Sequence, residues 1–150
     1  MKIAIGSDHA AMDYRLMIIE YCRSLGYETE DFGAPAGSSL CYADVAGPVA
    51  KAVAAGQADR GLLICGSGVG MSMAANKVRG IRCVVCSEPY SAEMSRLHND
   101  ANILAFGARV VGTEVAKRLV EIFLKTPFEG GRHIPRVERI MALEKEERRQ

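Results

Sequence analysis

The stretch "LLICGSGVGMSMAANK" (62–77) runs from apolar residues into a loop with three glycines and then into residues that favour a helix. A short apolar run that leads directly into helix formers is typical of a buried strand followed by a helix. The same order recurs along the chain, with strands predicted over 2–6, 28–33, 60–65, 81–86 and 102–107, and helices over 11–25, 42–55, 70–78, 90–99 and 112–125. This alternation predicts an α/β fold with a parallel sheet that helices cover on both faces.

Length and composition suit one domain. The chain has 150 residues, of which 49% are hydrophobic and 25% charged, so we expect a single domain over 1–150. A further helix is predicted to begin near Pro135, with Val137, Ile140 and Met141 on its apolar side. The charged residues 144–150 are expected to fray.

Charge and hydropathy argue against several classes of partner. The formal net charge is +1, so no overall field would attract nucleic acid or an anionic membrane. No apolar run approaches the roughly 18 to 20 residues that a membrane helix needs, and Asp8 and His9 come too early for the apolar segment of a signal peptide. We therefore expect a cytoplasmic protein.

The cysteines indicate neither a disulfide framework nor a metal centre. Their number, five, is odd. Cys83 and Cys86 form a C-x-x-C pair, but the surrounding "IRCVVCS" is typical of a buried strand, and no second pair completes a zinc site. We predict no metal and no redox chemistry at this pair.

The carboxyl ends of the strands select the residues of the predicted site, because ligands of parallel sheets bind there. The loop after the third strand matches neither a dinucleotide fingerprint nor a P-loop, since Met71 occupies a glycine position that both motifs require. Its amides still lie at a helix N-terminus, which favours an anion. Cys65 precedes this loop, so the sequence predicts a thiolate base beside amides that could stabilise an oxyanion.

Arginine and histidine residues supply further candidates. Arg132 and Arg136 are four residues apart and could bind a phosphate together, with a solvated basic face as the alternative. His9 and His98 suit proton transfer near neutral pH. The histidines lack the spacing of metal ligands, which favours acid chemistry over zinc.

As a set, these segments resemble a known family. "GSDHA" (6–10), "ICGSGVGMSMAANK" (64–77), "GIRCVVCSEPYSAEMSRLHNDANILAFGARVVG" (80–112) and "EGGRH" (129–133) closely resemble the type B ribose-5-phosphate isomerases, in the family that also contains the galactose-6-phosphate isomerase subunits. The resemblance covers residues 2 to about 143. It implies a Rossmann-like three-layer sandwich with a five-stranded parallel sheet, an extra C-terminal helix, no metal or organic cofactor, and a homodimer with a shared active site, in some relatives paired into tetramers.

The resemblance also implies an aldose-ketose isomerase that interconverts ribose 5-phosphate and ribulose 5-phosphate through a cis-enediolate. Cys65 would be the base, His98 the acid that opens the furanose ring, and Ser67 a further catalytic residue. Loop residues that would hold the enediolate oxygens are Gly66, Ser67, Gly68, Val69 and Gly70.

Other residues would bind the rest of the substrate by this resemblance. Those implied for the phosphate are Arg109, Arg132 and Arg136, and those implied for the sugar are Asp8, His9, Tyr42 and Asn99. The segment with His98, Asn99 and Arg109 should face the Cys65 loop of a partner subunit.

Three sites depart from the family pattern, one of which is Ser67, where many relatives have threonine. Some relatives use a glutamate directly after the loop, where this chain has Met71, so Cys65 is the only base that the comparison offers. Many relatives have Asp-Tyr-Pro where this chain has Cys41-Tyr42-Ala43, which leaves allose 6-phosphate, galactose 6-phosphate or a tetrose phosphate as alternative substrates. A non-catalytic phosphosugar-binding module is an alternative function, and a thiol oxidoreductase would need a resolving cysteine that the sequence does not place near Cys65.

Overall fold

The computed structural model describes residues 1–35 and 37–146 and contains one five-stranded sheet. Its strands are all parallel and lie in the order β2-β1-β3-β5-β4. Their bounds are β1 Lys2–Ser7, β2 Glu28–Asp31, β3 Arg60–Cys65, β4 Cys83–Val85 and β5 Ile103–Gly107. The predicted α/β fold with a parallel sheet is confirmed.

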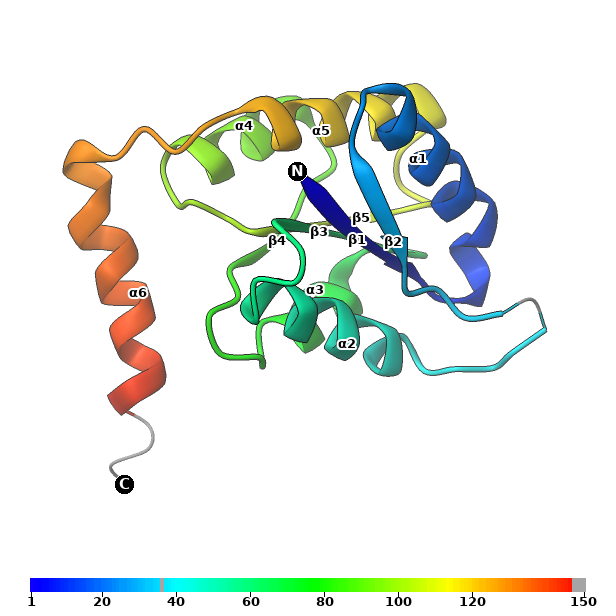
Figure 1. Cartoon of the computed structure of the whole chain (residues 1–150), viewed down its shortest axis with the longest axis horizontal. Helices are drawn as coiled ribbons and strands as arrows, with labels where there is room; N and C mark the ends of the chain where they lie inside the picture. Colours follow the sequence, from blue (N-terminus) through cyan, green and yellow to red (C-terminus); the bar gives the residue numbers. More distant parts are fainter. Residues whose placement is uncertain (36, 147–150) are drawn as a thin grey trace.

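Helices cover both faces of the sheet (Figure 1). On one face lie α1 (Met12–Ser24), α4 (Pro89–Leu97) and α5 (Thr113–Lys125), and on the other lie α2 (Tyr42–Ala54) and α3 (Val69–Ala75). Two short 3-10 helices, η1 (His9–Ala11) and η2 (Gly131–His133), precede α1 and α6 (Ile134–Glu146). The result is the expected three-layer sandwich with an extra C-terminal helix.

Alternating side chains of the strands divide the core into two clusters. Leu62 and Ile64 of β3 pack with α1 and α5, whereas Leu63 and Cys65 pack with α2 and α3. This alternation follows from the two-residue period of a strand that is buried on both faces. Cys65 therefore lies on the α2/α3 side of the sheet.

Three elements are shorter than predicted. β2 ends at Asp31, β4 covers only 83–85, and α3 ends at Ala75. Asn76 follows α3, and its side chain donates to the Cys83 carbonyl (2.9 Å) and accepts from the Cys83 N–H (2.8 Å). These bonds to β4 replace the continuation of the helix that the sequence predicted.

The C-terminal helix is longer than predicted. The expectation that residues 144–150 fray is wrong for 144–146, because α6 continues through Glu146. The Glu144 carboxylate accepts hydrogen bonds from the Gly80 N–H at 3.0 and 3.2 Å and lies 3.9 Å from Arg79 Nε. These contacts hold its last turns against the body of the molecule, while residues 147–150 of the prediction lie outside the described residues.

The predicted apolar side of α6 is only partly covered in the single chain, since Val137 and Met141 are half-buried and Ile140 is exposed. The helix lies beside the layered body, at the left of Figure 1, and none of its residues 134–146 is buried. Ile134, Ile140 and Leu143 are 45%, 42% and 49% exposed. Among the described residues, no helix combines the length and apolar character needed to cross a membrane.

The cysteines are free thiols, as predicted. Cys83 packs in the cluster on the α2/α3 side and Cys86 in the cluster on the α1/α5 side. Burial raises the pKa of Cys83 to about 12 and that of Cys86 to about 11. Cys83 is half-buried at the start of β4 and Cys86 is buried directly after its end, so the buried strand predicted for this C-x-x-C segment is present only in part.

Candidate functional site

Cys65 ends β3 at the carboxyl edge of the sheet, where the glycine loop begins. Its side chain is 6% exposed, and the Gly68 N–H donates a hydrogen bond to Sγ at 3.1 Å. Gly68 has φ +80°, and a β-carbon at this position would lie 2.8 Å from the Phe106 backbone. Glycine is therefore required here for both conformation and space, and it presents an amide to the sulfur.

Two neighbouring strands place polar residues beside this loop. In the parallel register, Ser7 pairs with Ile64 and Gly107 pairs with Cys65. The Asp8 N–H donates to the Ile64 carbonyl at 3.3 Å, and the Arg109 N–H donates to the Gly66 carbonyl at 3.1 Å. A β-carbon on Gly66 would lie 3.5 Å from Arg109 Nη1. The structure thus brings Asp8 and Arg109 to opposite sides of the Cys65 loop.

The remaining loop residues lie at the start of α3, beneath Tyr42. A β-carbon on Gly70 would lie 2.8 Å from the Tyr42 ring, which is itself 45% exposed. The Ser67 hydroxyl accepts from the Val69 N–H at 3.3 Å. We call the residues at this edge the thiol group: Asp8, His9, Tyr42, Cys65, Gly66, Ser67, Gly68, Val69, Gly70 and Arg109.

His9 follows Asp8 in η1 and is exposed. The Asp8 carboxylate accepts from the Ala10 N–H at 3.1 Å and so caps this short helix. This cap fixes the backbone of the predicted substrate residues at the carboxyl end of β1.

The other predicted residues belong to a second group, which also includes two residues that were not predicted. We call this the histidine group: His98, Asn99, Glu129, Arg132, His133 and Arg136. The His98 ring stacks on the buried ring of His133, with centroids 4.2 Å apart and planes 14° apart. Glu129 Oε2 lies 3.1 Å from His133 Nε2 and 3.9 Å from His98 Nε2. Arg132 Nε donates to His133 Nε2 at 3.4 Å, which links the histidines to one of the predicted phosphate-binding arginines.

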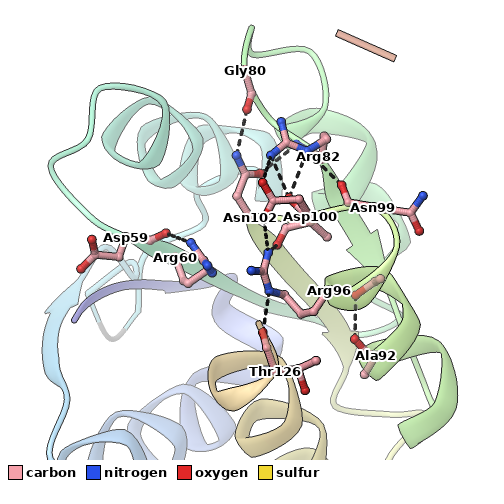
Figure 2. Close-up of polar contacts among 12 residues, drawn as sticks. Asp59, Arg60, Gly80, Arg82, Ala92, Arg96, Asn99, Asp100, Asn102 and Thr126 are labelled. Atoms are coloured by element: carbon pink, nitrogen blue, oxygen red, sulfur yellow. Dashed lines mark hydrogen bonds and ion pairs between the residues drawn. The ribbon is translucent and has the colours of Figure 1, made fainter. Parts of the chain in front are cut away.

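A polar network fixes the chain directly after His98 and Asn99 (Figure 2). Asp100 has φ +47° and lies 3.2 Å from Arg82 Nη2 and 2.9 Å from Arg96 Nη1. Arg82 Nε also donates to the carbonyls of Asn99 (3.2 Å) and Asp100 (3.0 Å), and Figure 2 shows the Asn99 side chain pointing away from Arg82. The buried Arg96 reaches the Thr126 carbonyl at 3.2 Å, which ties the end of α4 to the end of α5.

The two groups lie at opposite ends of the strands: the thiol group at the carboxyl ends and the histidine group at the amino end of β5. Asn102 directly precedes β5, whereas Arg109 follows its end, and a five-residue strand spans about 16 Å. The histidine group cannot therefore reach the Cys65 of its own chain. We expected Arg109 to lie with His98 and Asn99; it lies instead against the Cys65 loop of its own chain, because the β5 register places it there.

Comparison with known proteins identifies the family. Residues 3–140 match the Ribose/Galactose Isomerase family. The chain belongs to this family. It is 52% identical to ribose-5-phosphate isomerase B of Escherichia coli, over 95% of this chain and 96% of that protein. It is 42% identical to D-erythrulose-4-phosphate isomerase of Pectobacterium atrosepticum, over 100% and 99% of the two chains.

A solved structure is also similar to this isomerase. Ribose-5-phosphate isomerase B of Clostridium thermocellum is 51% identical, with a TM-score of 0.95 over 97% of this chain and 99% of that one. Likeness of this extent shows that the sheet order and the extra C-terminal helix are shared. The predicted sugar-phosphate isomerase class is confirmed by these relatives.

Two residues of the isomerase's histidine group were missed by sequence reasoning. His133 is 2% exposed and Glu129 lies four residues before it. The segment "EGGRH" contains both, but nothing in the sequence places this segment next to His98. The contact depends on the Glu129 N–H, which donates to the Leu97 carbonyl at 3.1 Å and brings the end of α4 beside η2.

Proposed function

We propose that this isomerase interconverts ribose 5-phosphate and ribulose 5-phosphate through a cis-enediolate. The observation that carries the proposal is the position of Cys65 Sγ, 3.1 Å from the Gly68 nitrogen at the start of a helix. In this position the Cys65 sulfur can act as the base that removes the weakly acidic proton next to a carbonyl. The same loop can then hold the enediolate oxygens through its amides and the Ser67 hydroxyl, which stabilises the charge as it forms.

The histidine group supplies the acid and the phosphate site in this proposal. His98 donates the proton that opens the furanose ring, and Asn99 contacts the sugar beside Asp8, His9 and Tyr42. Residues proposed to bind the phosphate are Arg109, Arg132 and Arg136. Binding the distant phosphate fixes the sugar, so that binding energy is used to orient the reacting carbons.

The separation of the two groups supports a site that two copies of the chain share. One copy provides Cys65, its loop and Arg109, and the other provides His98, Asn99, Arg132 and Arg136. We therefore propose a homodimer with two equivalent sites. Four further predictions from the sequence and the resemblance stay predictions: that dimers pair into tetramers, that the protein is cytoplasmic, that it uses no metal or cofactor, and that it binds neither nucleic acid nor membranes.

The choice of ribose 5-phosphate rests on the relatives. The relatives from Escherichia coli and Clostridium thermocellum, which are 52% and 51% identical, are ribose-5-phosphate isomerases B, whereas the relative named for erythrulose 4-phosphate is 42% identical. Allose 6-phosphate, galactose 6-phosphate and a tetrose phosphate remain the competing substrates, and kcat/KM for each measures the preference. Comparable values for all four would contradict ribose 5-phosphate as the preferred substrate.

Replacement of Cys65 tests the chemistry. We expect Cys65→Ala to lower isomerisation by at least about 100-fold, because the base is lost, while thermal stabilisation by the sugar phosphate remains. Cys41→Ala, at an exposed cysteine, is the matched control and should keep its activity. Wild-type protein should exchange substrate hydrogen with solvent deuterium, at C2 of ribose 5-phosphate or at C1 of ribulose 5-phosphate, which a non-catalytic binding module would not do. Near-normal turnover by Cys65→Ala would overturn the assignment of the base.

A further inference from the structure

The ring of His133 lies at the centre of the histidine group. It is 2% exposed, whereas the His98 side chain is 36% exposed, and the two rings are stacked at 4.2 Å. A stack of this kind restricts the plane of the more exposed ring, because rotation of His98 would lose the contact face. The orientation of His98 is thus set by a neighbour that solvent does not reach.

His133 is itself fixed through one nitrogen. Nε2 lies 3.1 Å from Glu129 Oε2 and accepts from Arg132 Nε at 3.4 Å. With a proton on Nε2 the ring can donate to Glu129, and without one it can accept from Arg132, so a partner is present in either protonation state. The backbone adds a further constraint, since the His133 N–H donates to the Gly130 carbonyl at 3.0 Å.

The same three side chains have the composition of a metal site, since His98, Glu129 and His133 offer ligand atoms within 4.8 Å of one another. The ring geometry argues against this use. A metal ion binds an imidazole nitrogen in the plane of the ring at about 2.0 to 2.1 Å. Two rings stacked with planes 14° apart direct their nitrogens along nearly parallel lines, which do not converge on one ion. Stacking and chelation are therefore mutually exclusive arrangements of this pair.

We propose that His133 is a positioning residue for the ring-opening step: its buried ring holds the plane of His98, and Glu129 and Arg132 hold His133. The inference rests on the proposed function, in which His98 donates a proton to the furanose oxygen. A general acid acts only from a narrow range of positions, so a loosely held His98 would protonate the ring oxygen more slowly.

The two directions of the reaction separate this role from a general loss of structure. Ribulose 5-phosphate is acyclic, so exchange of its C1 hydrogen with solvent needs Cys65 and the loop but no ring opening. Conversion of the furanose form of ribose 5-phosphate needs His98 as well. We expect His133→Ala to lower kcat for ribose 5-phosphate roughly tenfold or more, since misplacement of an acid by a fraction of an ångström has effects of this order. Exchange at C1 of ribulose 5-phosphate should stay within about threefold of wild type, because the base is untouched.

Conservative variants identify the contact that matters. His133→Phe keeps a stacking ring without its nitrogens and should retain most of the turnover that His133→Ala loses. Glu129→Gln should fall between wild type and His133→Ala, with Glu20→Gln on the exposed surface of α1 as the matched control. Thermal unfolding and the oligomeric state are measured for each variant so that only folded assemblies are compared.

Several outcomes would overturn the inference. His133 does not act through His98 if His133→Ala has a normal kcat, or if exchange and conversion fall equally. The same conclusion follows if only KM rises, which would place the effect of His133 on the arginines that bind the phosphate. Zn²⁺ binding that requires both His98 and His133 would also overturn it. The proposed function fails separately, if wild-type protein neither converts ribose 5-phosphate nor exchanges the C1 hydrogen.

Discussion

Gly68 combines two requirements at a single residue of the site. Its φ of +80° disfavours any side chain, and its hydrogen lies against the Phe106 backbone. We predict that Gly68→Ala costs more than about 2 kcal/mol of unfolding free energy and abolishes turnover, because the left-handed conformation alone costs roughly 1 to 2 kcal/mol and the clash adds to it. Gly26→Ala is the control, since φ there is +87° but no atom lies within 4 Å of the added carbon. If chemical denaturation shows that both variants lose the same unfolding free energy, the close contact of Gly68 with β5 does not contribute to stability.

At the scale of elements, the conformation of the loop that connects α4 to β5 depends on Asp100. Its carboxylate pairs with Arg82 and with Arg96, which is 2% exposed. Asp100→Ala should lower the unfolding free energy by about 2 kcal/mol or more, because it leaves a buried guanidinium without its charge partner. Asp100→Asn should cost less, since asparagine tolerates positive φ and can still accept hydrogen bonds.

Urea denaturation of the two Asp100 variants measures these costs, and ribose 5-phosphate turnover reports whether the end of α4 still holds His98. Glu114→Ala removes the exposed ion pair with Lys117 on α5 and should change stability by less than about 1 kcal/mol. A loss from Asp100→Ala no larger than that of this control would contradict a structural role for the network.

Some elements of this fold can be predicted from the sequence, and others cannot. β3 and β5 carry continuous apolar runs because both faces are buried, so their existence and order follow from local pattern. The length of α6 does not, because its last turns are held by Gly80 and Arg79, far away in the sequence. The site divides in the same way: the rule that ligands bind at the carboxyl ends of parallel strands groups Asp8 with Cys65, whereas the contact of His98 with His133 depends on the packing of η2 against α4. The local sequence pattern predicts which residues meet at the carboxyl ends of neighbouring strands, but only the tertiary structure shows which side chains from separate segments pack together.

At the scale of the whole molecule, the proposed homodimer accounts for two features of the single chain. Its thiol and histidine groups lie at opposite ends of the strands, and α6, which lies beside the layered body (Figure 1), exposes Ile134, Ile140 and Leu143. An exposed apolar face of this kind is typical of a surface that another subunit covers. A twofold arrangement would place each histidine group at the thiol group of the other copy, and would form two equivalent sites at once.

Mixing two inactive variants tests this sharing directly. Cys65→Ala and His98→Ala should each be inactive alone. In a mixed dimer, one site carries both substitutions and the other carries neither, so one of its two sites is intact. Random re-association of equal amounts gives mixed dimers in half of the assemblies, and activity should therefore recover to about one quarter of wild type. Native mass spectrometry, which separates the mixed dimer from the two parent dimers by mass, confirms that subunits have exchanged, and exchanged mixtures that stay inactive would show that each chain builds its own site. Recovery near one quarter is specific to sharing, because sites built from one chain would all keep one of the two substitutions.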